Sequence, residues 1–213
     1  MAEGLRERKK RQTRQYISDV ATGLILERGF DAVTIAEIAT AADVSVNTVY
    51  NYFPAKEDLF LDRSKELIQR LSRYVRGRAA GESAAAAVLH QLRTEVESVS
   101  PRVGLMVGYA RFLEVVQGSA ALQARMWHMQ RQQYEDLEAT LREETGAAEG
   151  DPLPRLMAGQ ITWLHQMLTV TIAQAMLAGR EPVEVSREAL VLLDEMEELL
   201  GERVLNYAVR TGG

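Results

Sequence analysis

Residues 34–59 read TIAEIATAADVSVNTVYNYFPAKEDL, and this stretch decides the predicted fold. Thr34 and Glu37 have the S/T-x-x-E spacing of a capping box, in which each side chain accepts a hydrogen bond from a backbone N–H group at the start of a helix. The spacing therefore predicts a short helix over residues 35–41. A tight turn follows it, because Asp43 tolerates the left-handed backbone that such a turn often requires.

Ser45 follows that turn and is placed to cap a second short helix that runs to about Asn51. Two short helices that cross at a steep angle need small or aliphatic side chains where they touch. The residues at the expected contact are Ile38, Ala39, Ala42, Val44 and Val49. This pattern predicts a helix-turn-helix. The residues that its second helix would offer to a DNA major groove are Val46, Asn47, Thr48, Tyr50 and Asn51.

A helical hairpin that packs inside the protein is the alternative to a DNA-reading helix. The same stretch, together with LILERGFDAV at residues 24–33, resembles the N-terminal domain of the tetracycline-repressor (TetR) family over roughly residues 14–62. Asp43 departs from the family by replacing the usual turn glycine, and Asn47 stands where Gly, Pro or Ser is common. The resemblance implies an all-α fold of about nine helices, with a three-helix DNA-binding domain joined to a larger helical bundle.

The resemblance also implies which residues contact the phosphate backbone. Thr34 would reach a phosphate from the start of its helix, where backbone N–H groups also point. Ser45, Thr48 and Tyr50 would donate hydroxyl protons to phosphates, and Lys56 would bind a further phosphate. Helix capping is the alternative role for each hydroxyl, and for Ser45 the two roles are compatible.

Val46 and Asn47 are the expected base contacts. The amide of an asparagine pairs with adenine through two hydrogen bonds, and a valine offers an apolar surface to the methyl group of thymine. Asn51 completes the outward-facing set that is assigned to DNA. Tyr52 and Phe53 are expected in the core instead.

The rest of the chain predicts helices and no strands, because it holds few prolines and lacks an alternating apolar pattern bounded by turns. A first helix of about residues 6–28 ends at Gly29, and a long fourth helix is expected over about residues 55–79. Further helices are expected over residues 83–99, 101–117, 120–145, 153–178 and 184–209. This pattern indicates two domains: residues 1–55 with the helix-turn-helix and a basic N-terminal arm, and residues 56–213 for ligand binding and dimerisation.

The 213 residues carry a net charge of −5, which is unevenly distributed. Residues 1–14 hold six basic and two acidic side chains, a local charge of +4 that leaves −9 for the remainder. A basic end on an acidic body is typical of a protein that meets phosphate at one end only. The arm from Arg6 to Arg14 is either a solvated tail or a contact to phosphates or the minor groove.

The absence of cysteine excludes disulfides and thiolate chemistry. The basic start is not followed by the apolar segment of a signal peptide. Residues 156–179 lack charged side chains, yet their glutamines, threonines and histidine make them too polar for a lipid-exposed helix. We therefore expect a cytoplasmic protein without a membrane span.

No combination of residues indicates catalysis. The three histidines lack metal-ligand spacing with carboxylates, and there is no G-x-x-x-x-G-K-[ST] loop, nucleophile elbow or H-E-x-x-H motif. We expect no catalytic residue, no metal and no cofactor. Gly104 and Gly108, four residues apart, are expected to let two helices approach closely.

Two apolar stripes run along the helix expected at residues 153–178. One has heptad-like steps of four and three residues, through Leu156, Gln160, Trp163, Met167, Val170, Gln174 and Leu177. The other contains Ile161, Leu164, Leu168, Ile172 and Ala175. Because a helix that is apolar on two sides needs two partners, we expect one stripe to face the core and the other a second subunit. The last helix would join it in a four-helix homodimer interface.

Aromatic and methionine side chains of the second domain indicate a site for a small, largely apolar effector. The candidate contacts are Met106, Tyr109, Phe112, Trp127, Tyr134, Trp163, Gln166 and Met167. Further polar candidates are Arg111, Glu114, His128 and His165. Core packing or surface exposure is the alternative for each of them.

Together, these patterns predict a homodimeric transcriptional regulator. We expect a repressor that binds a near-palindromic double-stranded DNA operator and is released by a small molecule. A DNA-binding dimer without an effector is one alternative, and a helical protein-binding adaptor is the other.

Overall fold

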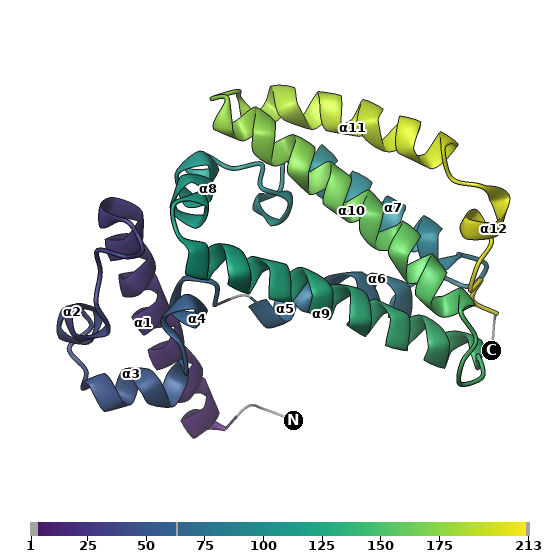
Figure 1. The fold of residues 1–213 in the computed structure, drawn as a ribbon. Helices are drawn as coiled ribbons and strands as arrows, with labels where there is room; N and C mark the ends of the chain where they lie inside the picture. Colours follow the sequence, from purple (N-terminus) through teal and green to yellow (C-terminus); the bar gives the residue numbers. More distant parts are fainter. Residues whose placement is uncertain (1–3, 63, 212–213) are drawn as a thin grey trace. The chain divides into compact units, whose positions relative to one another are not determined.

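The computed structural model describes residues 4–62 and 64–211, and the regular structure of these residues is entirely helical (Figure 1). They form twelve α-helices and one short 3-10 helix, which confirms the expected all-α class. The helices outnumber the expected nine because three of the expected helices are interrupted. In these two ranges, no helix is long and apolar enough to cross a membrane.

The chain forms two compact units. The first contains the described residues up to Lys65 together with Glu114–Trp127, and the second contains Glu66–Leu113 and the described residues from His128 onward. The helices that lie wholly within the first unit are α1 (Leu5–Arg28), α2 (Ile35–Ala41), α3 (Val46–Tyr52) and α4 (Lys56–Phe60).

The first unit extends past the division that the sequence predicts between residues 55 and 56. Leu59 of α4 is fully buried, and its carbonyl oxygen accepts a hydrogen bond of 2.9 Å from the Ser18 hydroxyl of α1. Asp58 of the same helix pairs with Arg125 at 2.8 Å. These contacts attach α4 and the segment 114–127 to the helices that precede them.

The first helix, α1, buries Ile17, Ala21 and Ile25 on one face. It ends at Gly29, whose φ of 89° is a backbone conformation that L side chains rarely adopt. The expected end of this helix is confirmed. Its start at Leu5 agrees with the expected start at about residue 6, so the basic residues from Arg6 to Arg14 belong to the helix and do not form a separate arm.

Arg14, the last residue of that expected arm, has structural partners within the first unit. Its guanidinium pairs with Asp62, donates to the carbonyl oxygen of Tyr52 at 2.5 Å, and lies 4.1 Å from the centre of the Phe53 ring. The contact to Tyr52 places this part of α1 beside the end of α3. Arg14 therefore fastens α1 to the segment that follows α3.

The capping box at the start of α2 is present. The Thr34 hydroxyl accepts from the backbone N–H of Glu37 at 3.2 Å, and the Glu37 carboxylate accepts from the backbone N–H of Thr34 at 2.8 Å. Arg28 of α1 pairs with the other oxygen of Glu37 at 2.7 Å. The hydrogen bond from Arg28, followed by those from Thr34, lowers the pKa of Glu37 from 4.5 to about 2.

The prediction of one long helix over residues 55–79 is wrong. The chain forms three short helices there, α4, α5 (Ser64–Ile68) and α6 (Arg70–Arg76). Leu59, Phe60 and Leu61 are consecutive and all buried. Successive side chains of a continuous helix point about 100° apart, so three in a row cannot share one face, and the helix ends where they all turn inward.

The helix expected over residues 101–117 is also interrupted. A 3-10 turn, η1 (Pro101–Val103), is separated from α8 (Tyr109–Gln117), because Gly104 and Gly108 both have a φ of 88°. The two glycines therefore interrupt a helix, and the expected close helix approach at this pair is wrong. A Cβ at Gly104 would lie 2.4 Å from the Tyr109 ring, so this glycine also makes room for that ring.

The last expected helix divides into α11 (Pro182–Glu198) and α12 (Glu202–Leu205). Leu199 ends α11, and Gly201 starts α12 in an extended conformation. The helix expected over residues 120–145 is confirmed as α9 (Ala120–Thr145), which runs from the first unit into the second.

The core of the second unit lies among α7 (Ala84–Glu97), α10 (Leu153–Leu177) and α11. Figure 1 shows α10 and α11 running side by side. The inner stripe of α10 consists of Ile161, Leu164, Leu168 and Ile172, all with at most 1% of their surface exposed, and the half-buried Ala175. One of the two expected apolar stripes therefore faces the core of its own subunit.

Truncation on this inner stripe is expected to be costly. Leu168→Ala should lower the free energy of unfolding by about 2–5 kcal/mol, because the neighbours cannot fill the space that a fully buried leucine leaves. Thr171→Ala, at an exposed position one turn along α10, is the matched control and should change it by less than about 0.5 kcal/mol. Urea unfolding of both variants measures the difference, and equal losses would contradict this assignment of faces.

The capping box should make stability depend on acid. Because the folded pKa of Glu37 lies below its ordinary value, its contribution is complete above about pH 4.5 and is lost as the pH falls towards about 2. The difference in urea midpoint between the natural chain and Glu37→Gln should therefore shrink from pH 6 to pH 3. Glu27→Gln, at an exposed site of α1, is the control. A gap for Glu37→Gln that stays constant with pH would refute the assignment.

Candidate nucleic-acid interface

The turn between α2 and α3 has the predicted geometry. Asp43 has a φ of 51°, in the left-handed region. Its backbone N–H donates to Thr40 at 3.2 Å, and the N–H of Val44 donates to Ala39 at 3.0 Å. An aspartate adopts this conformation more readily than most residues other than glycine, so the departure from the usual turn glycine leaves the turn intact.

The inner faces of α2 and α3 meet as expected. Ile38, Ala39 and Ala42 are buried, and Val49 of α3 is fully buried. Phe53 is also buried, which confirms its expected place in the core, whereas Tyr52 is half-buried. Four of the five expected contact residues are thus buried, and the fifth, Val44, is half-buried.

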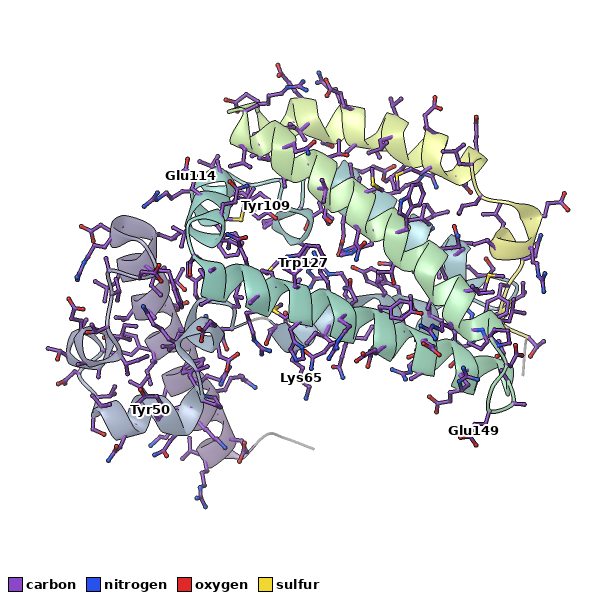
Figure 2. The ribbon with its side chains drawn as sticks, in the orientation of Figure 1. Tyr50, Lys65, Tyr109, Glu114, Trp127 and Glu149 are labelled. Atoms are coloured by element: carbon purple, nitrogen blue, oxygen red, sulfur yellow. The ribbon has the colours of Figure 1, made fainter. Side chains whose placement is uncertain are left out.

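The other face of α3 is open to solvent. Val46, Asn47 and Asn51 are exposed, and Tyr50 leaves 51% of its surface accessible (Figure 2). Thr48 is half-buried. Within the described part of the chain, the side-chain amides of Asn47 and Asn51 form no hydrogen bond. These amides are therefore available to a partner outside the subunit.

The hydroxyls of Ser45 and Thr48 take part in the cap of α3. Ser45 accepts from the backbone N–H of Thr48 at 3.0 Å, and the two hydroxyl oxygens lie 2.8 Å apart. One of these hydroxyls donates to the other, so one hydroxyl proton of the pair remains for an outside acceptor. Capping and phosphate contact are compatible here, as the sequence predicted for Ser45.

Thr34 offers less to a phosphate than the sequence suggested. Its hydroxyl proton is donated to the Glu37 carboxylate at 2.8 Å, and this acidic group lies beside it. A hydroxyl has only one proton, so a phosphate contact would require this hydrogen bond to break next to a negative charge. The geometry favours a capping role for Thr34.

Lys56, at the start of α4, also has an internal partner. Its ammonium donates to the carbonyl oxygen of Phe30 and lies 4.1 Å from the centre of the Phe30 ring. Burial lowers the pKa of Lys56 from its ordinary value. The ammonium has three protons, so two remain for a phosphate while the third ties α4 to the turn after α1.

Exposed basic residues extend this face along α1. Arg6, Arg8, Lys9 and Lys10 are exposed in the first turns of the helix, and the bond from Arg14 to Tyr52 places the helix beside the end of α3. The first unit therefore presents polar amides and a hydroxyl on α3 next to positive charge on α1. Such a surface suits a negatively charged double helix.

The residues expected to bind an effector are divided between the two units. Trp127, labelled in Figure 2, leaves 73% of its surface exposed and belongs to the first unit, as does Glu114, whereas the other candidates belong to the second. Met106, Trp163 and Met167 are exposed, and Gln166 is half-buried. Tyr109 and Phe112 do come together, with stacked rings 5.9 Å apart.

Tyr134, the remaining candidate, donates to the carbonyl oxygen of Arg155 at 3.3 Å. Sequence reasoning missed the buried polar residues of the second unit, above all Arg70 and Thr162. The sequence around Arg70 does not signal burial. Thr162, in contrast, lies on the inner side of the helix expected at residues 153–178, and this position is a signal of burial.

The comparisons with known proteins agree with the first unit. Residues 17–62 match the model of the family described as bacterial regulatory proteins, tetR family. The transcriptional regulator TcmR of Streptomyces glaucescens is 30% identical over 138 residues, which cover 55% of this chain and 61% of that protein. AcrR of Shigella flexneri is 43% identical over 49 residues, 23% of each chain. This chain thus spans less than two thirds of the curated relatives that it matches.

Solved structures share the fold over most of the chain. NalD of Pseudomonas aeruginosa, described as the secondary repressor of the MexAB-OprM multidrug efflux pump, has a TM-score of 0.56 at 19% identity and covers 87% of this chain and 97% of its own. A putative TetR-family regulator from Mesorhizobium loti has a TM-score of 0.55 at 18% identity and covers 89% and 97%. The helix-turn-helix geometry and the match over residues 17–62 agree on an N-terminal domain similar to that of the tetR family of bacterial regulatory proteins, and the chain shares its fold with these solved structures.

Proposed function

We propose that this chain is a transcriptional repressor that binds a near-palindromic DNA operator as a homodimer and is released by a small molecule. The observation that carries the proposal is the outer face of α3. Asn47, Tyr50 and Asn51 are exposed there on a helix whose other face is fixed by Val49. A helix held from behind with free amides in front is suited to read base edges in a major groove.

The side-chain chemistry of the outward residues on α3 assigns them different roles. Asn47, with Val46 beside it, is the base-reading residue, because an asparagine amide both donates and accepts. Tyr50 and the spare hydroxyl proton of Ser45 and Thr48 serve the phosphates. Those contacts position the protein without reading sequence.

A homodimer through α10 and α11 is supported by the second apolar stripe of α10. Trp163, Met167 and Val170 are exposed on that stripe, as are Val191 on α11 and Leu199 directly after it. Five large apolar side chains in water on two adjacent helices favour burial against a second copy. A dimer is also what a palindromic operator requires, with its two reading helices about 34–36 Å apart.

Release by an effector rests on the second unit, which has its own core separate from the reading head. Binding there would bias the spacing of the two reading helices through the short helices α4, α5 and α6. A coupling of roughly 1–3 kcal/mol is typical of such linkage. A regulator of this kind works in the bacterial cytoplasm, where its operator lies.

Asn47→Ala should change the DNA sequence that the protein prefers. Loss of the amide removes about 1–3 kcal/mol of discrimination at the base pair that it reads. Tyr50→Phe should instead weaken binding to all sequences by a similar factor. Selection from a randomised duplex pool, followed by fluorescence anisotropy on the selected duplex, measures both effects, and Asn206→Ala in the second unit is the control.

If Asn47→Ala and Tyr50→Phe both leave the selected sequence and its affinity unchanged, α3 does not read DNA. A helical protein-binding adaptor would then be the better interpretation. If Asn47→Ala lowers affinity equally for every sequence, the protein binds DNA but the base-reading residue is assigned wrongly.

Val170→Glu should weaken the dimer by on the order of tenfold or more, about 1.4 kcal/mol, because it would bury an unpaired carboxylate in the apolar interface. Val170 leaves 47% of its surface exposed in the single subunit, so the variant should still fold. Sedimentation velocity over a range of concentrations measures the change. Ala139→Glu, at an exposed position of α9, is the control, and an unchanged dimer in Val170→Glu would exclude this interface.

A further inference from the structure

Two polar side chains interrupt the buried stripe of α10. Thr162 and His165 are three residues apart, so they lie on the same side of the helix, and each is more than nine-tenths buried. Among the described residues, neither the Thr162 hydroxyl nor either ring nitrogen of His165 has a hydrogen-bond partner. Buried polar groups are almost always paired, so three unpaired atoms one turn apart call for a partner that the chain does not supply.

A buried cation lies in the same unit. Arg70, at the start of α6, has 8% of its surface exposed and donates from one terminal nitrogen to the carbonyl oxygen of Arg102 at 2.7 Å. In the ranges that the structure describes, no carboxylate forms an ion pair with Arg70. A buried charge without a counter-charge is costly, and a negatively charged molecule would relieve the cost.

The positive charge of Arg70 affects the pKa of one residue on α10 and of one residue on α8. Burial, followed by the positive charge of Arg70, lowers the pKa of His165 from 6.5 to about 3, so the imidazole is neutral at neutral pH. Burial raises the pKa of Tyr109, and Arg70 opposes that rise. Arg70, Tyr109 and His165 therefore lie in one electrostatic neighbourhood, although they come from three different helices.

One buried acidic group of this unit is engaged elsewhere. Glu95 of α7 accepts from the Tyr74 hydroxyl at 2.6 Å, and the same oxygen lies 3.8 Å from Arg102. Its second oxygen is buried without a partner. The carboxylate of Glu95 thus stays with Tyr74 and leaves the guanidinium of Arg70 without a direct anion.

Two aromatic rings of α8 lie in the same unit, and one of them, Tyr109, packs against the core cluster that contains Leu164 and Leu168 of α10. Tyr109 stacks on Phe112 with an angle of 10° between the rings, and Gly104 makes room for the Tyr109 ring. Figure 2 marks Tyr109 at the start of α8. Flat aromatic molecules pack well against such a pair.

We propose that Arg70, Thr162 and His165 bind the polar end of an aromatic carboxylate that carries a neighbouring hydroxyl, with its ring system against Tyr109. The guanidinium of Arg70 binds the carboxylate through its remaining donors. The neutral imidazole of His165 offers one donor and one acceptor, and the Thr162 hydroxyl offers the same, which suits a hydroxyl group on the ligand. The role of this molecule as effector rests on the proposed function, whereas its binding does not.

The first test compares two probes that differ only in charge. Isothermal titration calorimetry of the full chain with 3-hydroxy-2-naphthoate and with 3-hydroxy-2-naphthamide should show at least tenfold tighter binding of the carboxylate. Arg70→Gln should abolish this preference, and Arg70→Lys should reduce it, because lysine keeps the charge but loses the planar fork. Arg73→Gln, at an exposed position of the same helix, should retain it. Equal affinity of the natural chain for the two probes would overturn the proposal.

The second test separates a binding role from a structural one. Unpaired buried atoms destabilise a chain without ligand, so Thr162→Val and His165→Leu should raise its urea midpoint while they weaken the binding of 3-hydroxy-2-naphthoate several-fold. A lower midpoint with unchanged binding would show that the two residues are structural. Ordered water molecules on these atoms in a crystal, with no preference between the two probes, would also refute the site.

The DNA-binding assay then distinguishes the two proposals. Release of the selected duplex by 3-hydroxy-2-naphthoate from the natural chain, but not from Arg70→Gln, supports both the site and its effector role. Tight binding of the carboxylate without release keeps the site and removes the effector role. Intact DNA binding without any preference for the carboxylate keeps the regulator and removes the site.

Discussion

The contact between α2 and α3 across the turn at Asp43 is the constraint on which the reading head depends. The left-handed backbone of Asp43 lets the chain reverse in few residues, and Ile38 and Val49 fill the angle between the two helices. Because α3 has only seven residues, burial of Val49 fixes which side chains face outward. The amide of Asn47 and the hydroxyl of Tyr50 reach solvent for the same reason that Val49 does not.

Internal hydrogen bonds then distinguish the outward residues by how much hydrogen-bonding capacity each has left for DNA. Thr34 and Lys56 both have partners in their own unit, so part of their donor capacity is already used. Asn47 and Asn51 have none among the described residues, and their full capacity is open to a partner. The sequence analysis assigns all four residues to DNA alike, whereas the geometry separates side chains that build the reading head from those that are free to read.

Features that depend on residues close together in the sequence were predictable, whereas features that depend on contacts between distant residues were not. The capping box of Thr34 and Glu37, the cap at Ser45 and the bounds of α9 depend on neighbours within a few residues, so the pattern alone indicates them. The ends of α4 and the break at Gly104 depend on what surrounds Leu61 and Tyr109 in space. The burial of Arg70 was not predictable either, since an arginine in an amphipathic segment is normally exposed. Aromatic content was likewise a poor guide to an effector site, because Trp127 is a surface residue in this fold.

Unpaired polar groups are exposed to water in the first unit and buried in the second, and this difference bears on function. On α3 the free amides of Asn47 and Asn51 are exposed, so water satisfies them and DNA must only replace that water. Around Arg70 the atoms of Thr162 and His165 are buried without a partner among the described residues, so a molecule bound in the proposed site would gain their hydrogen bonds. A surface of the first kind favours a partner that arrives and leaves readily. In the proposed site, a bound molecule would stabilise the occupied unit relative to the empty one, and this difference in free energy is what an effector would need in order to shift the regulator between two states.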